Sequence, residues 1–110
     1  MSELQGLQLS LGEFAERSCD ILAVVVDSTA ENAKATHDLG LGFRVLSDPQ
    51  LQAIDAYGVR HANAPGAGDI ARPASFLIDR DGVVRWRDLT ANYRIRPRPE
   101  TILTELDKIR

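Results

Sequence analysis

The chain has 110 residues and a mass of 12.1 kDa, with 44% hydrophobic residues, 26% charged residues and a formal net charge of −3. This length and composition predict one globular domain over residues 1–110 with a single core. No apolar run reaches the ~18–20 residues that a membrane span needs, and no charged segment followed by an apolar one opens the sequence. We therefore expect neither a membrane span nor a signal peptide, and a cytoplasmic protein without a membrane partner.

The charge is unevenly distributed. Residues 1–57 hold three basic and nine acidic side chains, whereas residues 58–110 hold ten basic and seven acidic ones. Much of the basic excess comes from Arg85, Arg87, Arg94, Arg96 and Arg98. A basic cluster can indicate a nucleic-acid partner. Because few aromatic residues accompany it and the pI is about 5.3, we expect no nucleic-acid partner.

The first predicted elements are an amphipathic helix over residues 3–17 and a strand over residues 20–26. The apolar positions of the helix recur at helical spacing; they are Leu4, Leu7, Leu11 and Phe14, widened by Leu9 and Ala15. The strand is a continuous apolar run, a pattern typical of a parallel strand buried on both faces.

A helix, a short strand and a second helix come next, over residues 29–39, 44–46 and 48–57. Ser28 or Thr29 caps the first helix and Gly40 ends it. Asp48-Pro49 starts the second helix and Gly58 stops it. Residues 61–70 lack periodicity and predict a loop, either a lid over a pocket beside Pro73 or an ordinary surface loop.

Residues 71–85 predict a β-hairpin entered through a proline. Asp81-Gly82 between two apolar runs favours a two-residue turn with positive φ angles. Pro73 lacks an N–H and therefore stands at the entrance to the first arm. A final helix over residues 100–109 follows, with its apolar side inward: Ile102, Leu103, Leu106 and Ile109.

This alternation of helices and strands predicts an α/β fold with helices on both faces of the sheet. The right-handed crossover rule predicts that strand 20–26 is parallel to strand 74–79, with strand 83–88 antiparallel at one edge.

Three segments resemble thioredoxin-fold redox proteins of the alkyl hydroperoxide reductase/thiol-specific antioxidant group, the peroxiredoxin-like redoxins. The run R-P-A-S-F-L-I-D-R-D-G at residues 72–82 is similar to their P-x-(T/S)-F-L-I-D-x-D-G segment. L-S-D-P at 46–49 with A-Y-G-V at 56–59, and the helix–strand unit at 14–28, are also similar. The resemblance implies a thioredoxin-like three-layer α/β/α fold with a mixed sheet, here N-terminally truncated.

The resemblance also implies where the family's reactive cysteine belongs. It lies in a P-x-x-C or C-P-x-C motif at the N-terminus of the first helix, where the helix dipole favours the thiolate. No cysteine precedes that helix here. Two explanations stay open: a naturally absent segment, or a start codon assigned too late, for example after a selenocysteine codon read as a stop.

Cys19 is the only cysteine, which excludes a disulfide within the chain and a cysteine-based metal cluster. Reactive thiols need electropositive, accessible surroundings, whereas Glu16 and Asp20 flank this one. We expect a half-buried structural thiol. The alternative, a nucleophile or an intermolecular disulfide, remains open.

Arg72 and Pro73 are the candidate substrate-side residues. The resemblance implies a cis-proline that faces the reactive cysteine, and an arginine that polarises a peroxide. Arg72 stands four residues before Phe76, however, and not three as in the R-x-x-F pattern of the peroxidases. The alternative is a strand-entry proline beside a surface cation.

The sequence predicts neither a metal nor a cofactor. Asp79-Arg80-Asp81-Gly82 resembles the opening of a calcium loop but lacks its later carboxylates. His37 and His61 have no paired ligand spacing.

The family activity implied by the resemblance is thiol-dependent reduction of peroxides or disulfides, with a dithiol such as thioredoxin as reductant. Without the family's cysteine motif, the chain is expected to be inactive alone. The alternative is a non-catalytic binding or assembly module with the same fold. Because losing the opening strand would expose a sheet edge, we also expect a homodimer, including a strand-exchanged one.

Overall fold

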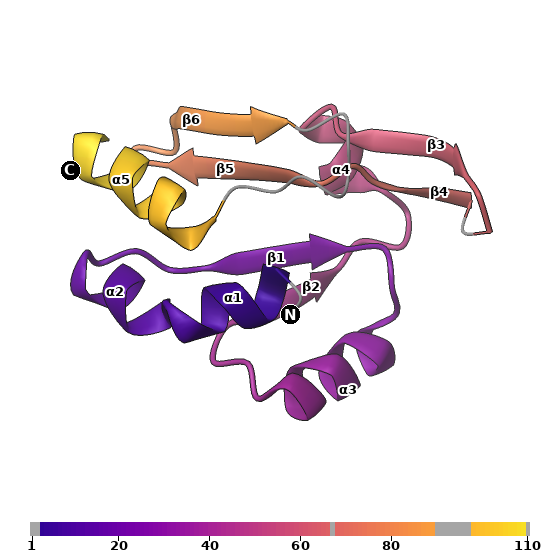
Figure 1. Cartoon of the computed structure of the whole chain (residues 1–110). Coiled ribbons are helices and arrows are strands. Elements are labelled where there is room, and N and C mark those ends of the chain that lie inside the picture. Colours follow the sequence, from indigo (N-terminus) through magenta and orange to yellow (C-terminus); the bar gives the residue numbers. More distant parts are fainter. Residues whose placement is uncertain (1–2, 67, 90–97, 110) are drawn as a thin grey trace. The chain divides into compact units, whose positions relative to one another are not determined.

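A computed structural model describes residues 3–66, 68–89 and 98–109. The chain divides into two compact units, each described by itself: Met1–Cys19 together with Pro73–Arg110, and Asp20–Arg72. Their helices and strands are labelled in Figure 1.

The unit of residues 20–72 begins with a parallel β–α–β motif. It consists of β1 (Leu22–Val25), α3 (Thr29–Leu39) and β2 (Arg44–Ser47). The Ser28 hydroxyl accepts a hydrogen bond from the Glu31 N–H at 3.1 Å, and Gly40 ends α3 at a φ of 63°. The predicted helix over 29–39, with its cap and its stop, is therefore confirmed.

One expectation for the first strand is wrong. Leu22 and Val24 are 59% and 38% exposed, so the strand is not buried on both faces. The hydrogen-bonded parallel partner of β1 is β2, whereas the strand over Ala74–Ile78 pairs in another sheet, and the parallel orientation of strands 20–26 and 74–79 stays a prediction. The reason for this pairing is local: α3 is a crossover helix that returns the chain beside the strand it has just left.

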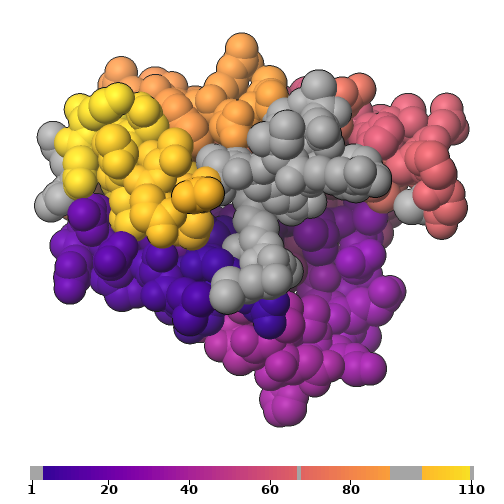
Figure 2. Space-filling view, viewed as in Figure 1, coloured from indigo at the N-terminus to yellow at the C-terminus, as the bar shows by residue number. Residues whose placement is uncertain are grey.

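The helix α4 (Gln52–Ala56) is shorter than predicted and begins after Asp48-Pro49. The expected loop over 61–70 is instead an antiparallel hairpin, β3 (Arg60–Ala64) with β4 (Gly68–Ala71). A register shift between His61 and Ala64, with Asn63 at a φ of 55°, breaks the two-residue alternation that would have revealed the strands. Atoms of the β3–β4 hairpin, pink to red along the colour bar, are visible in the space-filling view (Figure 2), and Gly66 is exposed.

The other unit starts with two short helices, where the sequence predicted one. α1 (Glu3–Leu9) and α2 (Leu11–Glu16) are separated at Ser10, whose N–H donates to the carbonyl of Leu7, three residues back. Leu9 is 75% exposed and Ala15 is exposed, so neither widens the apolar stripe, whereas Phe14 is buried. Serine and nearby glycine have low helix propensity, which explains the interruption.

β5 (Ala74–Ile78) and β6 (Val84–Leu89) form the predicted antiparallel hairpin. Its loop has three residues rather than two. The Gly82 N–H donates to the Asp79 carbonyl and the Asp79 N–H donates to the Val83 carbonyl, and of the loop residues Gly82 alone has a positive φ, 82°. This is a type I turn followed by a glycine bulge.

The helix α5 (Pro99–Ile109) confirms the last predicted element, with Ile102, Leu103 and Leu106 buried. Arg17, which ends α2, donates from Nε to Asp107 of α5 at 2.8 Å and so ties the two ends of the chain together. Arg94 and Arg96 of the predicted basic cluster lie outside the described residues.

Candidate functional site

Arg72 is the exposed residue that directly follows β4. Its N–H donates to the carbonyl of Val59 at 2.7 Å, and its side-chain Nε donates to the carbonyl of Arg60 at 3.3 Å. In the described part of the chain, no carboxylate pairs with this guanidinium. Arg72 is therefore a charged group held by main-chain contacts and not neutralised by an ion pair.

Pro73 stands at the entrance to β5, as the sequence predicted. The Arg72–Pro73 bond is trans, like the other peptide bonds between described residues, so the cis form that the family resemblance implies is not found at Pro73. The trans form of an X–Pro bond is lower in free energy by about 0.5–1 kcal/mol and is adopted unless the surrounding structure imposes the cis form.

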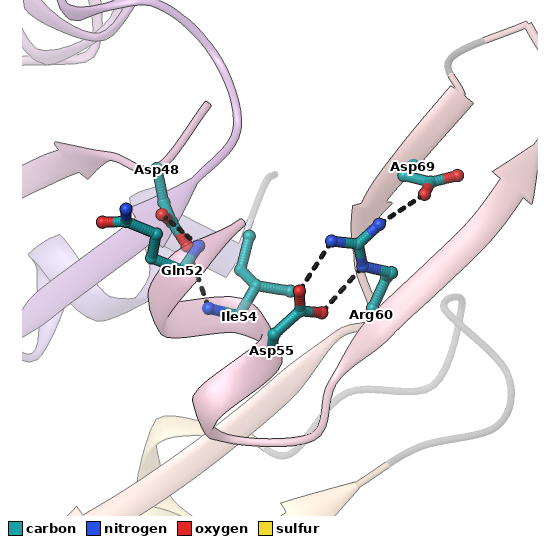
Figure 3. Close-up of polar contacts among 6 residues, drawn as sticks. All are labelled: Asp48, Gln52, Ile54, Asp55, Arg60 and Asp69. Carbon is teal, nitrogen blue, oxygen red and sulfur yellow. Dashed lines mark hydrogen bonds and ion pairs between the residues drawn. The ribbon is translucent and has the colours of Figure 1, made fainter. Parts of the chain in front are cut away.

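A cluster of one arginine and two aspartates joins α4 to the β3–β4 hairpin, the two elements that precede Arg72 in the chain (Figure 3). Arg60 donates from Nε and Nη2 to the two carboxylate oxygens of Asp55, at 2.7 and 2.6 Å. Its Nη1 donates to Asp69 at 2.7 Å, and the other oxygen of Asp69 accepts the Asn63 N–H at 2.9 Å. Arg60 thus joins the end of α4 to both strands of the β3–β4 hairpin.

These contacts favour the charged forms of all three side chains. The hydrogen bond from Arg60 lowers the pKa of Asp55 below its ordinary value. The pKa of Asp69 is lowered first by the N–H of Asn63 and then by Arg60. The hydrogen bonds to Asp55 and Asp69 raise the pKa of Arg60. We call Asp55, Arg60 and Asp69 the Arg60 cluster.

Asp48 fixes the other end of α4. Its buried carboxylate accepts the N–H groups of Gln52 and Ile54, both at 2.9 Å (Figure 3). These are N–H groups of the first turn, which have no partner within the helix. Asp48 thus holds the start of α4, and Asp55 at the end of α4 binds Arg60, whose carbonyl accepts the Nε–H of Arg72.

Sequence reasoning missed the Arg60 cluster. Asp55 lies five residues before Arg60, a spacing that brings no two side chains together on a helix. Asp69 reaches Arg60 only because the β3–β4 hairpin folds back. Recognising the hairpin from its Pro65-Gly66 turn would have been the necessary signal.

Cys19 is half-buried and lies just beyond the C-terminal end of α2. Its N–H donates to the Phe14 carbonyl at 3.0 Å, the Ser18 N–H donates to the Ala15 carbonyl at 3.0 Å, and Ser18 has a φ of 55°. This pattern is a Schellman motif, which ends a helix. The expectation of a half-buried thiol is confirmed.

The calcium-like segment uses its carboxylate for a turn. Asp79 accepts the N–H groups of Asp81 and Val83 through Oδ1 and the Arg85 Nε through Oδ2. Among residues 3–66, 68–89 and 98–109, no group of three or more His, Cys, Asp or Glu side chains is placed to hold a metal ion.

The model of the AhpC/TSA family matches residues 1–87 of the chain, a range that includes Cys19, Arg72 and Pro73. The chain belongs to the AhpC/TSA family. No curated protein matches it.

Solved structures of this family's relatives have a similar fold. Reduced Prx3 of Vibrio vulnificus in complex with H2O2 is 20% identical with a TM-score of 0.85, covering 94% of this chain and 66% of that one. Mycobacterium tuberculosis AhpC is 25% identical with a TM-score of 0.82, and the match covers 97% of this chain and 59% of that one. A cysteine-to-serine mutant of Peroxiredoxin 6 of Arenicola marina is 16% identical with a TM-score of 0.87, and the match covers 96% of this chain and 52% of that one.

These likenesses confirm the thioredoxin-like α/β fold expected for an AhpC/TSA chain. The chain spans between about half and two thirds of the length of these three structures. None of its described helices is long and apolar enough to span a bilayer.

Proposed function

We propose that this chain is a peroxiredoxin-like thiol redox domain whose own cysteine is not the peroxide-reducing nucleophile. In the proposed family reaction, a thiolate attacks a peroxide, the O–O bond breaks to release water or an alcohol, and the cysteine becomes a sulfenic acid. Attack on a disulfide instead breaks its S–S bond, releases one thiol and leaves a mixed disulfide. A dithiol partner then reduces either product back to the thiol and is itself oxidised to a disulfide, with release of water from the sulfenic acid. The observation that supports excluding Cys19 as the nucleophile is its place beyond the C-terminal end of α2.

The physical reason is the direction of the helix dipole. A helix N-terminus carries partial positive charge and stabilises a thiolate, whereas a C-terminus carries partial negative charge and disfavours one. Two acidic residues lie near Cys19 in the sequence, Glu16 three residues before it and Asp20 directly after it. The 110-residue chain alone is therefore proposed to be inactive as a peroxidase.

Arg72 is proposed as the substrate-side residue, with Pro73 beside it in the chain. The support is that Arg72 is exposed, oriented by two main-chain contacts and without a carboxylate partner in the described residues. A guanidinium stays charged at any physiological pH and offers directed donors to an oxygen ligand.

The proposed setting is a single domain that forms a homodimer in the cytoplasm. A dithiol protein such as thioredoxin is the proposed reductant for the family reaction. No metal, cofactor, membrane or nucleic acid has a part in the proposal.

A second candidate function is a non-catalytic binding or assembly module. One observation favours it: Leu22, Val24 and Leu46 are 59%, 38% and 41% exposed on paired strands. Val24 is the register partner of Leu46, so the three side chains share one face of the β1–β2 sheet. Exposed apolar faces often mark interaction surfaces.

A peroxide-consumption assay with dithiothreitol tests the inactivity of the chain. The wild-type chain and the Cys19→Ser variant are both expected to consume hydrogen peroxide at the rate of dithiothreitol alone. Turnover above that rate, abolished by Cys19→Ser, would refute the proposal.

A fusion separates the two candidate functions. The opening segment of an AhpC/TSA protein, with its cysteine motif, is placed ahead of Met1. Peroxide turnover by this fusion, weakened by Arg72→Gln, supports the redox domain. A folded fusion without turnover favours the binding module.

A further inference from the structure

Arg60 contacts both the elements around the β3–β4 hairpin and Arg72, the candidate substrate-side residue. Its guanidinium bonds Asp55 at the end of α4 and Asp69 on β4. Its main-chain carbonyl accepts the Nε–H of Arg72. One residue therefore makes contacts in both directions, through its side chain and through its backbone.

The β3–β4 ladder is short and irregular, so by itself it does little to fix the position of the Arg60 carbonyl. The ladder pairs Arg60 with Ala71 and His61 with Ile70, and then shifts register before Ala64. Arg60 and Asp69 lie on the same face, since residues two apart on a strand share a face. The ion pair between Arg60 and Asp69 holds β3 and β4 together near the end of the hairpin that Arg72 follows. The ion pair between Arg60 and Asp55 holds β3 against α4.

We propose that Arg60 is the positioning residue for Arg72. The Arg60 cluster holds the β3 main chain in place, and the Arg60 carbonyl then fixes the Arg72 side chain through Nε. Within the described residues neither Nη group of Arg72 has a hydrogen-bond partner, so in the proposal both are available to an anionic or peroxidic oxygen. The inference rests on the proposed function of Arg72, but Arg60 itself touches no substrate.

The chemistry of the contacts explains why an arginine is needed at this position. Its planar fork reaches both oxygens of Asp55 and, with the remaining nitrogen, Asp69. A lysine carries the same charge, but its single ammonium group cannot reproduce this arrangement. Arg60→Lys is thus a conservative variant that keeps the positive charge but loses the simultaneous hydrogen bonds to Asp55 and Asp69.

Hydrogen exchange of the arginine Nε–H groups in the full 110-residue chain, followed by NMR, tests the inference. Arg72→Lys identifies the Arg72 signal. In the wild-type chain, the Arg72 Nε–H is expected to exchange with water at least about threefold more slowly than that of exposed Arg44. In the Asp55→Asn/Asp69→Asn double variant, the Arg72 rate should approach the Arg44 rate, and Arg60→Lys should raise it as well.

Asp107→Asn is the matched control, because it breaks the Arg17–Asp107 ion pair by the same chemical change in the other unit. It should leave the Arg72 rate as it is. Should the double variant unfold, Asp69→Asn and Arg60→Lys give the same readout singly. An unchanged Arg72 rate in a folded variant of the cluster would overturn the inference. No turnover is measured, so this outcome is independent of the peroxide assays.

Discussion

Asn32 donates a hydrogen bond from Nδ2 to the hydroxyl oxygen of Ser47 across 2.8 Å and so joins α3 to the end of β2. The Asn32 side chain also contacts the carbonyl of Asp27 at 3.4 Å, just past β1. Asn32 is only 4% exposed. Because a buried amide without partners is costly, these contacts fix the packing of the β–α–β motif.

Replacing Asn32 should therefore destabilise the chain. Asn32→Ala is expected to lower the free energy of unfolding by about 1–3 kcal/mol, since the Ser47 hydroxyl and a main-chain carbonyl lose their donor. Urea denaturation measures the change. Exposed Lys34→Ala on the same helix should stay within about 0.5 kcal/mol of wild type. Equal stabilities for the two variants would show that the amide has no structural role.

Ser18 offers a stabilising substitution. It adopts the left-handed conformation, φ 55°, at the end of α2 and is exposed. Ser18→Gly should raise the free energy of unfolding by about 0.5–1 kcal/mol, because glycine avoids the steric cost of that conformation. The reverse test is Gly40→Ala, at φ 63°, which should destabilise the chain. A lower thermal midpoint for Ser18→Gly contradicts this account of the helix end.

Asp48→Ala should loosen the start of α4. Two N–H groups lose their carboxylate acceptor, at a cost of about 1–2 kcal/mol in unfolding free energy. Asp48→Asn keeps one acceptor oxygen and should lie between Asp48→Ala and wild type in chemical denaturation. If Asn and Ala are equally destabilising, the charge of Asp48 matters more than its capping geometry.

Asp79 should make the stability depend on acidity. The Val83 N–H, and then the Arg85 side chain, hold the pKa of Asp79 below its ordinary value of 3.8. The folded state thus favours the charged carboxylate, and its contribution is present above pH 3.8 and lost as the pH falls through the lower folded pKa.

Urea titrations across the acid range check this dependence. The free energy of unfolding should fall below pH 3.8 in the wild-type chain. The fall should be shallower in Asp79→Asn, with the remainder due to Asp55 and Asp69, whose pKa values are also lowered. An identical decline in both proteins would mean that Asp79 does not take part.

The elements that the sequence predicted well have local determinants. α3 lies between a capping serine, Ser28, and a left-handed glycine, Gly40, and both are visible in the sequence. The β3–β4 hairpin was missed because the strained Asn63 interrupts the alternation of its side chains. The Arg60 cluster forms only in that hairpin, so it could not be predicted once the hairpin was missed.

Burial and bond geometry were harder to predict, because they depend on the rest of the fold. The apolar residues of β1 indicated a strand, but their exposure depends on what covers the sheet, and Leu22 is exposed. The half-buried state of Cys19 was predictable because the residue stands between a helix and a strand in the sequence. The trans bond before Pro73 could not be derived from a motif.

The most direct test of the central claim is the rate at which Cys19 of the native chain reacts with a thiol reagent at neutral pH. We predict a slower reaction than that of N-acetylcysteine under the same conditions, rising to the free-thiol rate when the chain is unfolded in urea. A native rate well above that of N-acetylcysteine would identify Cys19 as an activated nucleophile and contradict the account.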